Sequence, residues 1–420
     1  IDSHASPPSE RRLDNGLQVI LQPDPQIPVV ALALQYNVGS RDETPGASGR
    51  AHLFEHLMFQ GTQRVPASTH LQRINDVGGS ANASTSSSAT RYHAVLPTEH
   101  AALGLWLEAD RMEGLAVTED SFRMQLAAVI EERGQRVDDA PYGRAMEEFE
   151  ARSFANWAQG HPTIGSRADL DAATLPEVMD FHSRWYRPDN AALSIVGDFD
   201  PDELTAHVEA WFGGITAGGD RTRADLSEPP RSGPDHATVD DPLARLPALL
   251  LNHQAPAVGS PLAAACEVLE GVLFRGAAAR LQRALVIETS AAIQLGGGYD
   301  ARTGPGLFGL SAVIPQDGDY QYIVDTWMRA LETLANEPIS DDELLRTRQP
   351  LLAGHLFALE SPLTRALGFS DGALLHGDPT WHQTYLEAVS EVEPAHIQAA
   401  AQLLLQSPPV SMLVRPQERS

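Results

Sequence analysis

Apolar and polar positions along the chain alternate between strand-like and helix-like periods. A short apolar segment, a Pro-rich turn and a β-prone run over residues 29–38 predict two strands with a turn between them. The next segment predicts a helix with Ser48 as its N-cap and Gly61 just beyond its end. A Ser/Thr-rich strand pair is expected over 80–96. Further helices are expected over 69–77, 100–114, 121–133 and 203–212, and a further strand over 191–196.

The second half of the chain repeats the general order of the first. Residues 216–235 are rich in Gly, Pro, Arg and Ser and have few apolar positions, which indicates a linker. The segments that follow predict a strand over 248–252, a long helix over 261–285, strands over 291–295 and 307–313, and then more helices. This order indicates two related halves of about 200 residues each. We therefore expect two domains, residues 1–220 and residues 235–420.

Composition narrows the possible partners. Hydrophobic residues make up 42% and charged residues 20% of the 420 residues, as in a globular protein with a sizeable core, and no apolar stretch is long enough to cross a bilayer. The 30 basic residues, all arginine, stand against 56 acidic ones, and the net charge of −26 argues against nucleic acid or an anionic membrane as partner. Such a surface attracts cationic ligands, including basic peptides, although solubility is its simpler explanation.

Cysteine content and the first residues bear on the compartment. Cys266 is the single cysteine, which excludes an internal disulfide and a cysteine-based zinc site. The sequence opens on Ile1 with no apolar signal segment. We expect an exported protein, for example a periplasmic one, whose signal has been removed; a cytoplasmic location is the alternative.

The sharpest chemical signal is the run from His52 through Glu55 to His56. Histidines at positions i and i+4 lie on one helix face, close enough to bind one ion. Catalytic zinc takes three protein ligands and keeps one position for water, whose proton an adjacent carboxylate can accept. Chance produces only about 0.04 such five-residue matches in a chain of this composition. The alternative is an apolar core helix with incidental polar residues, which would be costly without a partner such as a metal.

A third ligand is required, and the pair Glu131-Glu132 is the best candidate because it lies in a mostly apolar predicted helix. Glu132 shares a stripe with Gln125 and Ala128, next to the apolar stripe, whereas Glu131 lies about 100° around the helix. Periodicity favours Glu132 but leaves both residues open. An exposed, charged helix end is the alternative.

The order His-x-x-Glu-His resembles the inverzincin signature of the pitrilysin/insulinase family. Other segments of the chain resemble blocks of that family too: 39–43, 49–62, 78–85, 161–162, 186–190 and 197–198. The two-domain length is similar to the mitochondrial-processing-peptidase-like branch. The resemblance implies an α+β fold of two similar domains, each an antiparallel β-sheet packed with α-helices.

The resemblance also implies a metal and a reaction. One Zn²⁺ per chain would be held by His52, His56 and a distal glutamate, and the family's spacing assigns that glutamate to Glu132. Glu55 would be the general base that activates water. The implied activity is a zinc-dependent endopeptidase that cleaves short or unfolded peptides.

Asn82 and Ala83 match the family residues that line a substrate peptide, which is added to the sheet as an extra strand. Two other functions are compatible with a family of this kind. A non-catalytic structural or assembly subunit would be expected to have a degraded metal motif, which this chain does not have. A metal-binding but inactive homologue is the second alternative.

Two departures from the family pattern stand out. Gln125 occupies a position where the family usually has a glutamate near the zinc but outside its ligand set, so hydrogen bonding is kept and the charge is lost. Val286 and Ile293 fall where active members have an Arg and a Tyr that hold the substrate and the oxyanion. Both are expected to be core residues, at a helix end and in a strand. We therefore expect a heterodimer with a homologous, zinc-less subunit that supplies the Arg and the Tyr.

Overall fold

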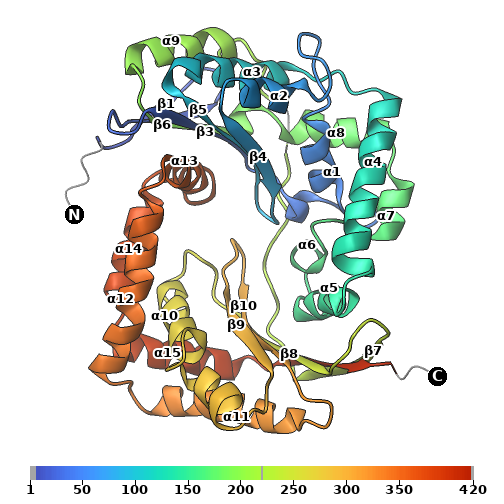
Figure 1. The fold of residues 1–420 in the computed structure, drawn as a ribbon, viewed down its shortest axis with the longest axis vertical. Helices are drawn as coiled ribbons and strands as arrows, with labels where there is room; N and C mark the ends of the chain where they lie inside the picture. Colours follow the sequence, from blue (N-terminus) through green and yellow to red (C-terminus); the bar gives the residue numbers. More distant parts are fainter. Residues whose placement is uncertain (1–5, 219–220, 418–420) are drawn as a thin grey trace. The chain divides into compact units, whose positions relative to one another are not determined.

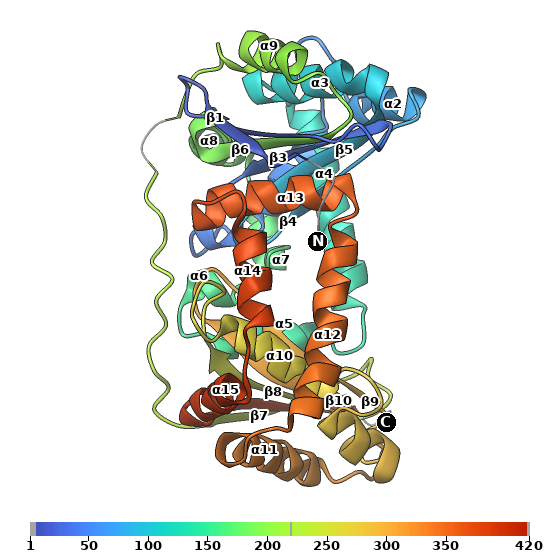
Figure 2. The same ribbon diagram turned by 90° about the vertical axis from the view of Figure 1, so that its left-hand side faces the viewer.

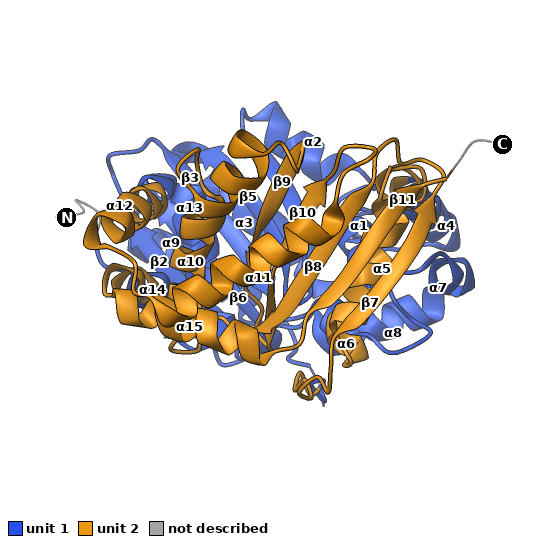
Figure 3. Cartoon of the chain, turned by 90° about the horizontal axis from the view of Figure 1, so that it is seen from below, with its two compact units in different colours: residues 1–131, 162–224, 357–384 blue, residues 132–161, 225–356, 385–420 orange. Residues whose placement is uncertain are grey.

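The structure is a computed structural model that describes residues 6–218 and 221–417. The chain forms two compact units, which Figure 3 distinguishes by colour. Unit 1 comprises residues 1–131, 162–224 and 357–384, and unit 2 comprises 132–161, 225–356 and 385–420. Each unit contains one mixed, mainly antiparallel sheet with helices packed on it, which confirms the predicted α+β fold class.

The sheet of unit 1 has the strand order β1-β2-β6-β3-β5-β4. All neighbouring strands in it are antiparallel except β2 and β6, which are parallel. Its central strands are apolar and buried on both faces, whereas β4 is an edge strand and half-exposed. The strands are β1 (Ser9–Arg12), β2 (Gln18–Pro23), β3 (Val29–Tyr36), β4 (Ser80–Thr85), β5 (Thr90–Pro97) and β6 (Ala191–Gly197).

Helices cover both faces of this sheet because both faces are apolar. The main core lies between one face and the helices on it, such as α3 and α9 (Figure 1). Helix α13 (Pro362–Asp371) lies across the opposite face, over β6 and β3 (Figure 2). The other helices that begin in this unit are α1 (Arg50–Leu57), α2 (Thr69–Asp76), α3 (Ala101–Glu113), α4 (Glu119–Arg133), α7 (Arg167–Ala172), α8 (Leu175–Trp185), α9 (Pro201–Phe212) and α14 (Trp381–Ser390).

Unit 2 repeats this topology with one strand fewer. Its sheet has the order β7-β11-β8-β10-β9, in which only β7 and β11 are parallel, so β9 is an edge strand in the place that β4 has in unit 1. The strands are β7 (Asp235–Asp241), β8 (Ala248–Ala255), β9 (Gln294–Asp300), β10 (Gly306–Val313) and β11 (Val410–Pro416). Its α-helices are α5 (Gly143–Ser153), α6 (Trp157–Gly160), α10 (Ala263–Phe274), α11 (Tyr320–Asn336), α12 (Asp341–Ala358) and α15 (Pro394–Gln406).

The compact units differ from the two contiguous halves of the sequence in two segments. Residues 132–161 precede the linker but belong to unit 2, where Phe149 of α5 packs against Met412 and its neighbours on the sheet. Residues 357–384 follow the linker but belong to unit 1, where Phe369 of α13 packs against Ala33. Each sheet therefore receives the cover for one apolar face from the other half of the sequence.

Three local predictions were wrong. The strand expected over 291–295 begins later, because β9 comprises Gln294–Asp300. The helix expected over 261–285 is interrupted, because α10 ends at Phe274 and Gly276 adopts a left-handed φ of +84° before a π-helical turn, η5 (Gln282–Glu288). Ser48 is not the N-cap of α1; Gly49 is, and the Ser48 hydroxyl donates to Asp169 instead, at 2.5 Å. Within the described parts of the chain, no helix is both long enough and apolar enough to cross a membrane.

Candidate metal centre

Helix α1 presents both motif histidines. Their rings lie one turn apart, with centroids separated by 4.9 Å, and His52 is only 9% exposed while His56 is half-buried. The buried carboxylate of Glu43 accepts hydrogen bonds from the backbone N–H groups of Gly49 and Ala51, at 2.9 and 2.7 Å. These bonds satisfy amides at the first turn of α1 that have no partner within the helix. The start of the helix, and with it His52, is thereby held in place.

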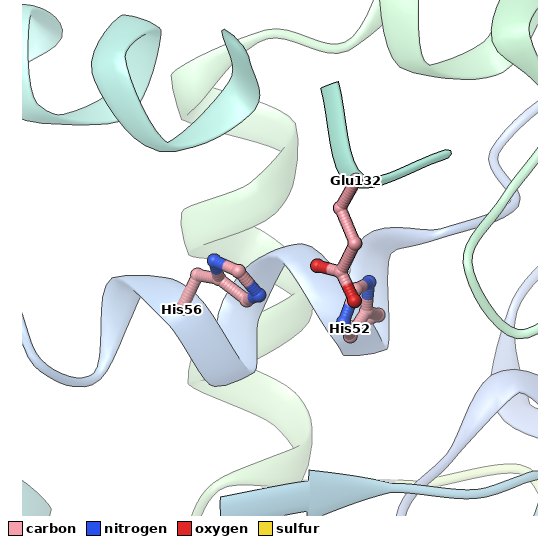
Figure 4. Close-up of side chains that lie close together, drawn as sticks. All are labelled: His52, His56 and Glu132. Carbon is pink, nitrogen blue, oxygen red and sulfur yellow. The ribbon is translucent and has the colours of Figure 1, made fainter. Parts of the chain in front are cut away.

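The last turn of α4 brings Glu132 to the two histidines. Ligand atoms of His52, His56 and Glu132 all lie within 4.8 Å of one another, and the three side chains point toward one another in Figure 4. Among the residues that the structure describes, they are the one group of three that could hold a metal ion. Glu131, which periodicity left open, is exposed. Two imidazoles and a carboxylate form a donor set that suits catalytic zinc.

Neighbouring side chains contact His56 and Glu132. Gln125 lies about two turns before Glu132 in α4. Its amide oxygen is 3.3 Å from Nδ1 of His56. An amide oxygen can only accept, so Nδ1 carries the proton in this bond and Nε2 is left as the ligand atom. Arg136 contacts Oε1 of Glu132 through Nη1 at 2.6 Å. The hydrogen bond from Gln125 thus fixes the orientation of the His56 ring, as residues that contact metal ligands generally do.

Glu55 projects from α1 beside the edge strand β4. Its Oε2 accepts a hydrogen bond from the hydroxyl of Thr85 at 2.5 Å. Asn82 and Ala83 lie on the same strand, and together with Glu55 and His56 they line a pocket of about 320 Å³. The remaining lining residues are Phe59, Gln60, Ser68, Leu71 and Gln125. A carboxylate, a candidate metal ligand and a sheet edge therefore meet at one cavity.

A buried polar cluster supports the wall of this pocket. The guanidinium of Arg111 lies 4.2 Å from the centre of the Tyr92 ring and forms hydrogen bonds with Glu108. Burial, and secondarily the charge of Arg111, lowers the pKa of the neighbouring His70 to about 2. Burial also raises the pKa of Tyr92 well above its usual value. Both shifts keep His70 and Tyr92 uncharged at physiological pH.

Val286 and Ile293, which the resemblance places where active members have an Arg and a Tyr, lie in unit 2. Val286, in η5, is half-buried and packs against the core of the unit. Ile293 immediately precedes β9 and is 55% exposed, so its prediction as a core residue was wrong. Neither side chain can donate a hydrogen bond.

Three contacts of the site were not predicted from the sequence. Glu43 and Thr85 lie within the blocks that resemble the family, but no local pattern assigned them a role. The spacing of Arg136, four residues after Glu132, is a recognisable signal for an ion pair on a helical segment.

Comparisons with known proteins place the chain among peptidases of one family. The model described as "Insulinase (Peptidase family M16)" matches residues 18–166, and the model described as "Peptidase M16 inactive domain" matches 172–351. The zinc protease PqqE of Helicobacter pylori is 31% identical over 277 residues, which are 65% of this chain and 62% of that protein. An uncharacterized zinc protease of Mycobacterium leprae is 26% identical over 400 residues, 94% of this chain and 88% of that protein.

A solved structure has the same fold along nearly the whole chain. The crystal structure of a protease from Helicobacter pylori matches with a TM-score of 0.92 at 26% identity and covers 98% of this chain and 100% of that one. The candidate metal ligands His52, His56 and Glu132 lie within the range of the first family model. Val286 and Ile293 lie within the range of the second. The chain belongs to peptidase family M16, the insulinase family of zinc metallopeptidases, with an N-terminal catalytic and a C-terminal inactive domain.

Proposed function

We propose that this chain is a zinc-dependent endopeptidase that cleaves short or unfolded peptides. The observation that carries the proposal is the convergence of His52, His56 and Glu132, from two helices, beside the carboxylate of Glu55. The three converging residues would hold one zinc ion per chain. A bound zinc would polarise the scissile carbonyl and make a water molecule acidic enough to attack it.

Glu55 is the general base in this proposal. It follows His52 by three residues on the same helix and borders the pocket that also contains His56. A carboxylate at that position takes the proton of the attacking water and can pass it to the leaving amine. Gln125 orients His56 without adding a further negative charge next to Glu132 and Glu55.

The substrate would bind along the free edge of β4. This strand pairs with β5 on one side only, in the register Asn82 to His93 and Ala83 to Tyr92. A peptide that adds a strand to such an edge gains backbone hydrogen bonds with little demand on its sequence. The pocket beside Ala83 has a volume of about 320 Å³ and takes one peptide side chain, with Phe59 and Leu71 as apolar walls. The net charge of −26 favours cationic peptides.

A homologous, zinc-less subunit would supply the Arg and the Tyr that this chain lacks. The support is the pair Val286 and Ile293, neither of which can stabilise an oxyanion. Assays of the purified chain, alone and with whatever copurifies with it from its native source, test this part. Vigorous cleavage of an unfolded peptide by the chain alone would refute the requirement for a partner.

Metal content and three matched variants test the site. Zinc is expected at one equivalent per chain, and Glu132→Gln should lower zinc affinity by about 10-fold or more, since it removes a charged ligand. Glu131→Gln, one residue away on the exposed side, is the control and should retain the metal.

Glu55→Gln should retain zinc but lose cleavage by about 10²- to 10⁴-fold, the range for a general base. Bound zinc together with no cleavage by the unmodified chain, under any pairing, would indicate an inactive homologue. Equal loss of zinc in Glu131→Gln and Glu132→Gln would contradict the assignment of the third ligand.

A further inference from the structure

We propose that Thr85 is a positioning residue that holds the carboxylate of Glu55, so that the strand that receives the peptide also orients the base. The inference rests on the proposed function, because it concerns the same base and the same sheet edge. Its starting observation is the hydrogen bond of 2.5 Å from Oγ1 of Thr85 to Oε2 of Glu55.

Strand periodicity explains why the Thr85 side chain reaches α1. Alternate residues of β4 are half-buried, and Ala81 and Ala83, on the face that Thr85 shares, pack against the core of unit 1. Helix α1 contacts β4. Thr85 is the last residue of β4 and lies on the same face as Ala81 and Ala83. Its hydroxyl supplies a hydrogen-bond donor next to α1, which an apolar side chain could not do. The hydroxyl of Thr85 faces the base, whereas the peptide edge is formed by backbone groups.

The turn after Thr85 is fixed by its own hydrogen bonds. The Ser86 hydroxyl accepts from the backbone N–H groups of Ser88 and Ala89, at 3.3 and 3.1 Å. The backbone N–H of Ser86 donates to the carbonyl of Ala89 at 2.9 Å. Such serine turns restrict the backbone, so the end of β4 has little freedom to move.

A single loop, residues 39–43, ties this turn to the start of α1. The backbone N–H groups of Ser40 and Arg41 donate to the carbonyls of Ser86 and Ser87, at 3.2 and 3.0 Å. At the other end of the loop, the Glu43 carboxylate accepts the first amides of α1. Both partners of the bond between Thr85 and Glu55 are therefore attached to the same short segment. The fold therefore sets the distance between the two backbones, and the hydrogen bond from Thr85 selects the rotamer that the Glu55 carboxylate adopts.

A fixed carboxylate matters because proton transfer needs the base within hydrogen-bond reach of the water, and a displacement of about 1 Å can cost 10²-fold in rate. Loss of the Thr85 hydroxyl should leave the backbone edge of β4 and the metal ligands intact. The expected signature is a fall in kcat with little change in KM, since the interaction concerns the reacting geometry and not the binding of the peptide.

Thr85→Val is the informative variant because valine keeps the β-branched shape and removes only the hydroxyl. With one fluorogenic peptide and saturating zinc, and with the partner subunit present if activity requires it, kcat should fall by about 10- to 100-fold while KM changes by less than about threefold. Thr85→Ser restores the hydroxyl and should recover kcat to within about threefold of the unmodified chain. Thr174→Val is the matched control: it removes a threonine-to-glutamate hydrogen bond of 2.9 Å, to Glu177 on the surface at the start of α8.

A second readout does not depend on catalysis. In metal-free protein, Thr85→Val should unfold at a lower urea concentration than the unmodified chain. The same substitution should lower the midpoint less when it is made in Glu55→Ala, because the hydrogen bond is already absent there. Equal kcat for Thr85→Val and the unmodified chain, equal losses for the Val and Ser variants, or equal shifts of the urea midpoint in both backgrounds would each overturn the inference. Full activity of Glu55→Gln would instead refute the proposed function itself, so the two failures are distinguishable.

Discussion

His182 provides a sharp test of how the metal-bearing helix is packed. It lies in α8, is 6% exposed, and its ring stacks on Phe54 of α1 at a centroid distance of 4.4 Å and an angle of 21°. Tyr186 is a second ring neighbour, at 5.4 Å. Phe54 lies between His52 and Glu55 in the motif, so the contact supports the helix from behind the site. Burial, with a smaller contribution from the charge of Arg187, lowers the pKa of His182 from 6.5 to about 3.

The sign of the effect on stability follows from proton binding. Between pH 3 and pH 6.5 the unfolded chain binds a proton at His182 and the folded chain does not, so acid favours the unfolded state. From about pH 7.5 to about pH 5, the difference in proton binding amounts to about 2 kcal/mol of lost stability. Because pH 5 lies well above the folded pKa, this figure depends almost entirely on the unfolded value.

The perturbation is His182→Phe, which keeps a ring against Phe54 but cannot bind a proton. Urea unfolding with a chelator present, fitted with a separate transition for each compact unit, gives the free energy at both pH values. The unmodified chain should lose about 2 kcal/mol more than the variant between the two pH values. Any packing cost of the larger ring is common to both pH values and cancels. An identical loss in both proteins would refute the neutral, buried state of His182.

Three further predictions concern other parts of the fold. Gly39→Ala should destabilise unit 1 by about 1–3 kcal/mol, as measured by urea unfolding, because a Cβ there would lie 2.2 Å from the carbonyl oxygen of Ser86. Asp24→Asn should cost about 3 kcal/mol in the same assay, because it leaves the buried guanidinium of Arg365 without its carboxylate partner at 2.6 Å. Addition of zinc at about 100 times its dissociation constant should stabilise the folded chain by ~2.7 kcal/mol, and calorimetry with and without EDTA should record the shift in Tm.

The histidine pair of the site was predictable because its geometry is local. Two residues four apart on a helix share a face whatever the rest of the chain does, so His52 and His56 could be assigned from the sequence. The assignment of Glu132 as the third ligand required information beyond the sequence pattern, since periodicity alone did not distinguish it from Glu131. The assignment came from the resemblance, and the structure adds the reason: Glu132 faces α1 at the end of α4, and Glu131 faces solvent.

The exchanged segments were not predictable from local patterns. The apolar positions of α13, such as Phe369, predict that the helix is buried but not on which sheet, and the nearer sheet in sequence is the wrong one. The same holds for Phe149 of α5. The bond between Thr85 and Glu55 joins two segments whose register depends on the loop over 39–43 and the turn after β4. Each of these features is decided by tertiary packing.

Equivalent pairs of helices in the two halves of the fold meet through different polar side chains. In the first half of the chain, the helix after the second main strand (α1) and the second helix after the hairpin (α4) meet at His52, His56 and Glu132. The topologically equivalent helices of unit 2 are α10 and α12, and they meet at Glu267 and His355, whose Oε1 and Nε2 lie 2.9 Å apart.

Glu267 also accepts a hydrogen bond from the hydroxyl of Tyr385 at 2.6 Å, so its carboxylate links α10, α12 and α14. The hydrogen bond to Glu267 raises the pKa of His355, and the stability that this ion pair contributes is therefore present below about pH 6.5 and lost as the pH rises through the raised value. A zinc site responds in the opposite direction, because its ligands must release their protons to bind the ion. The ion pair between Glu267 and His355 thus links α10 and α12 at the place where α1 and α4 carry the three candidate metal ligands.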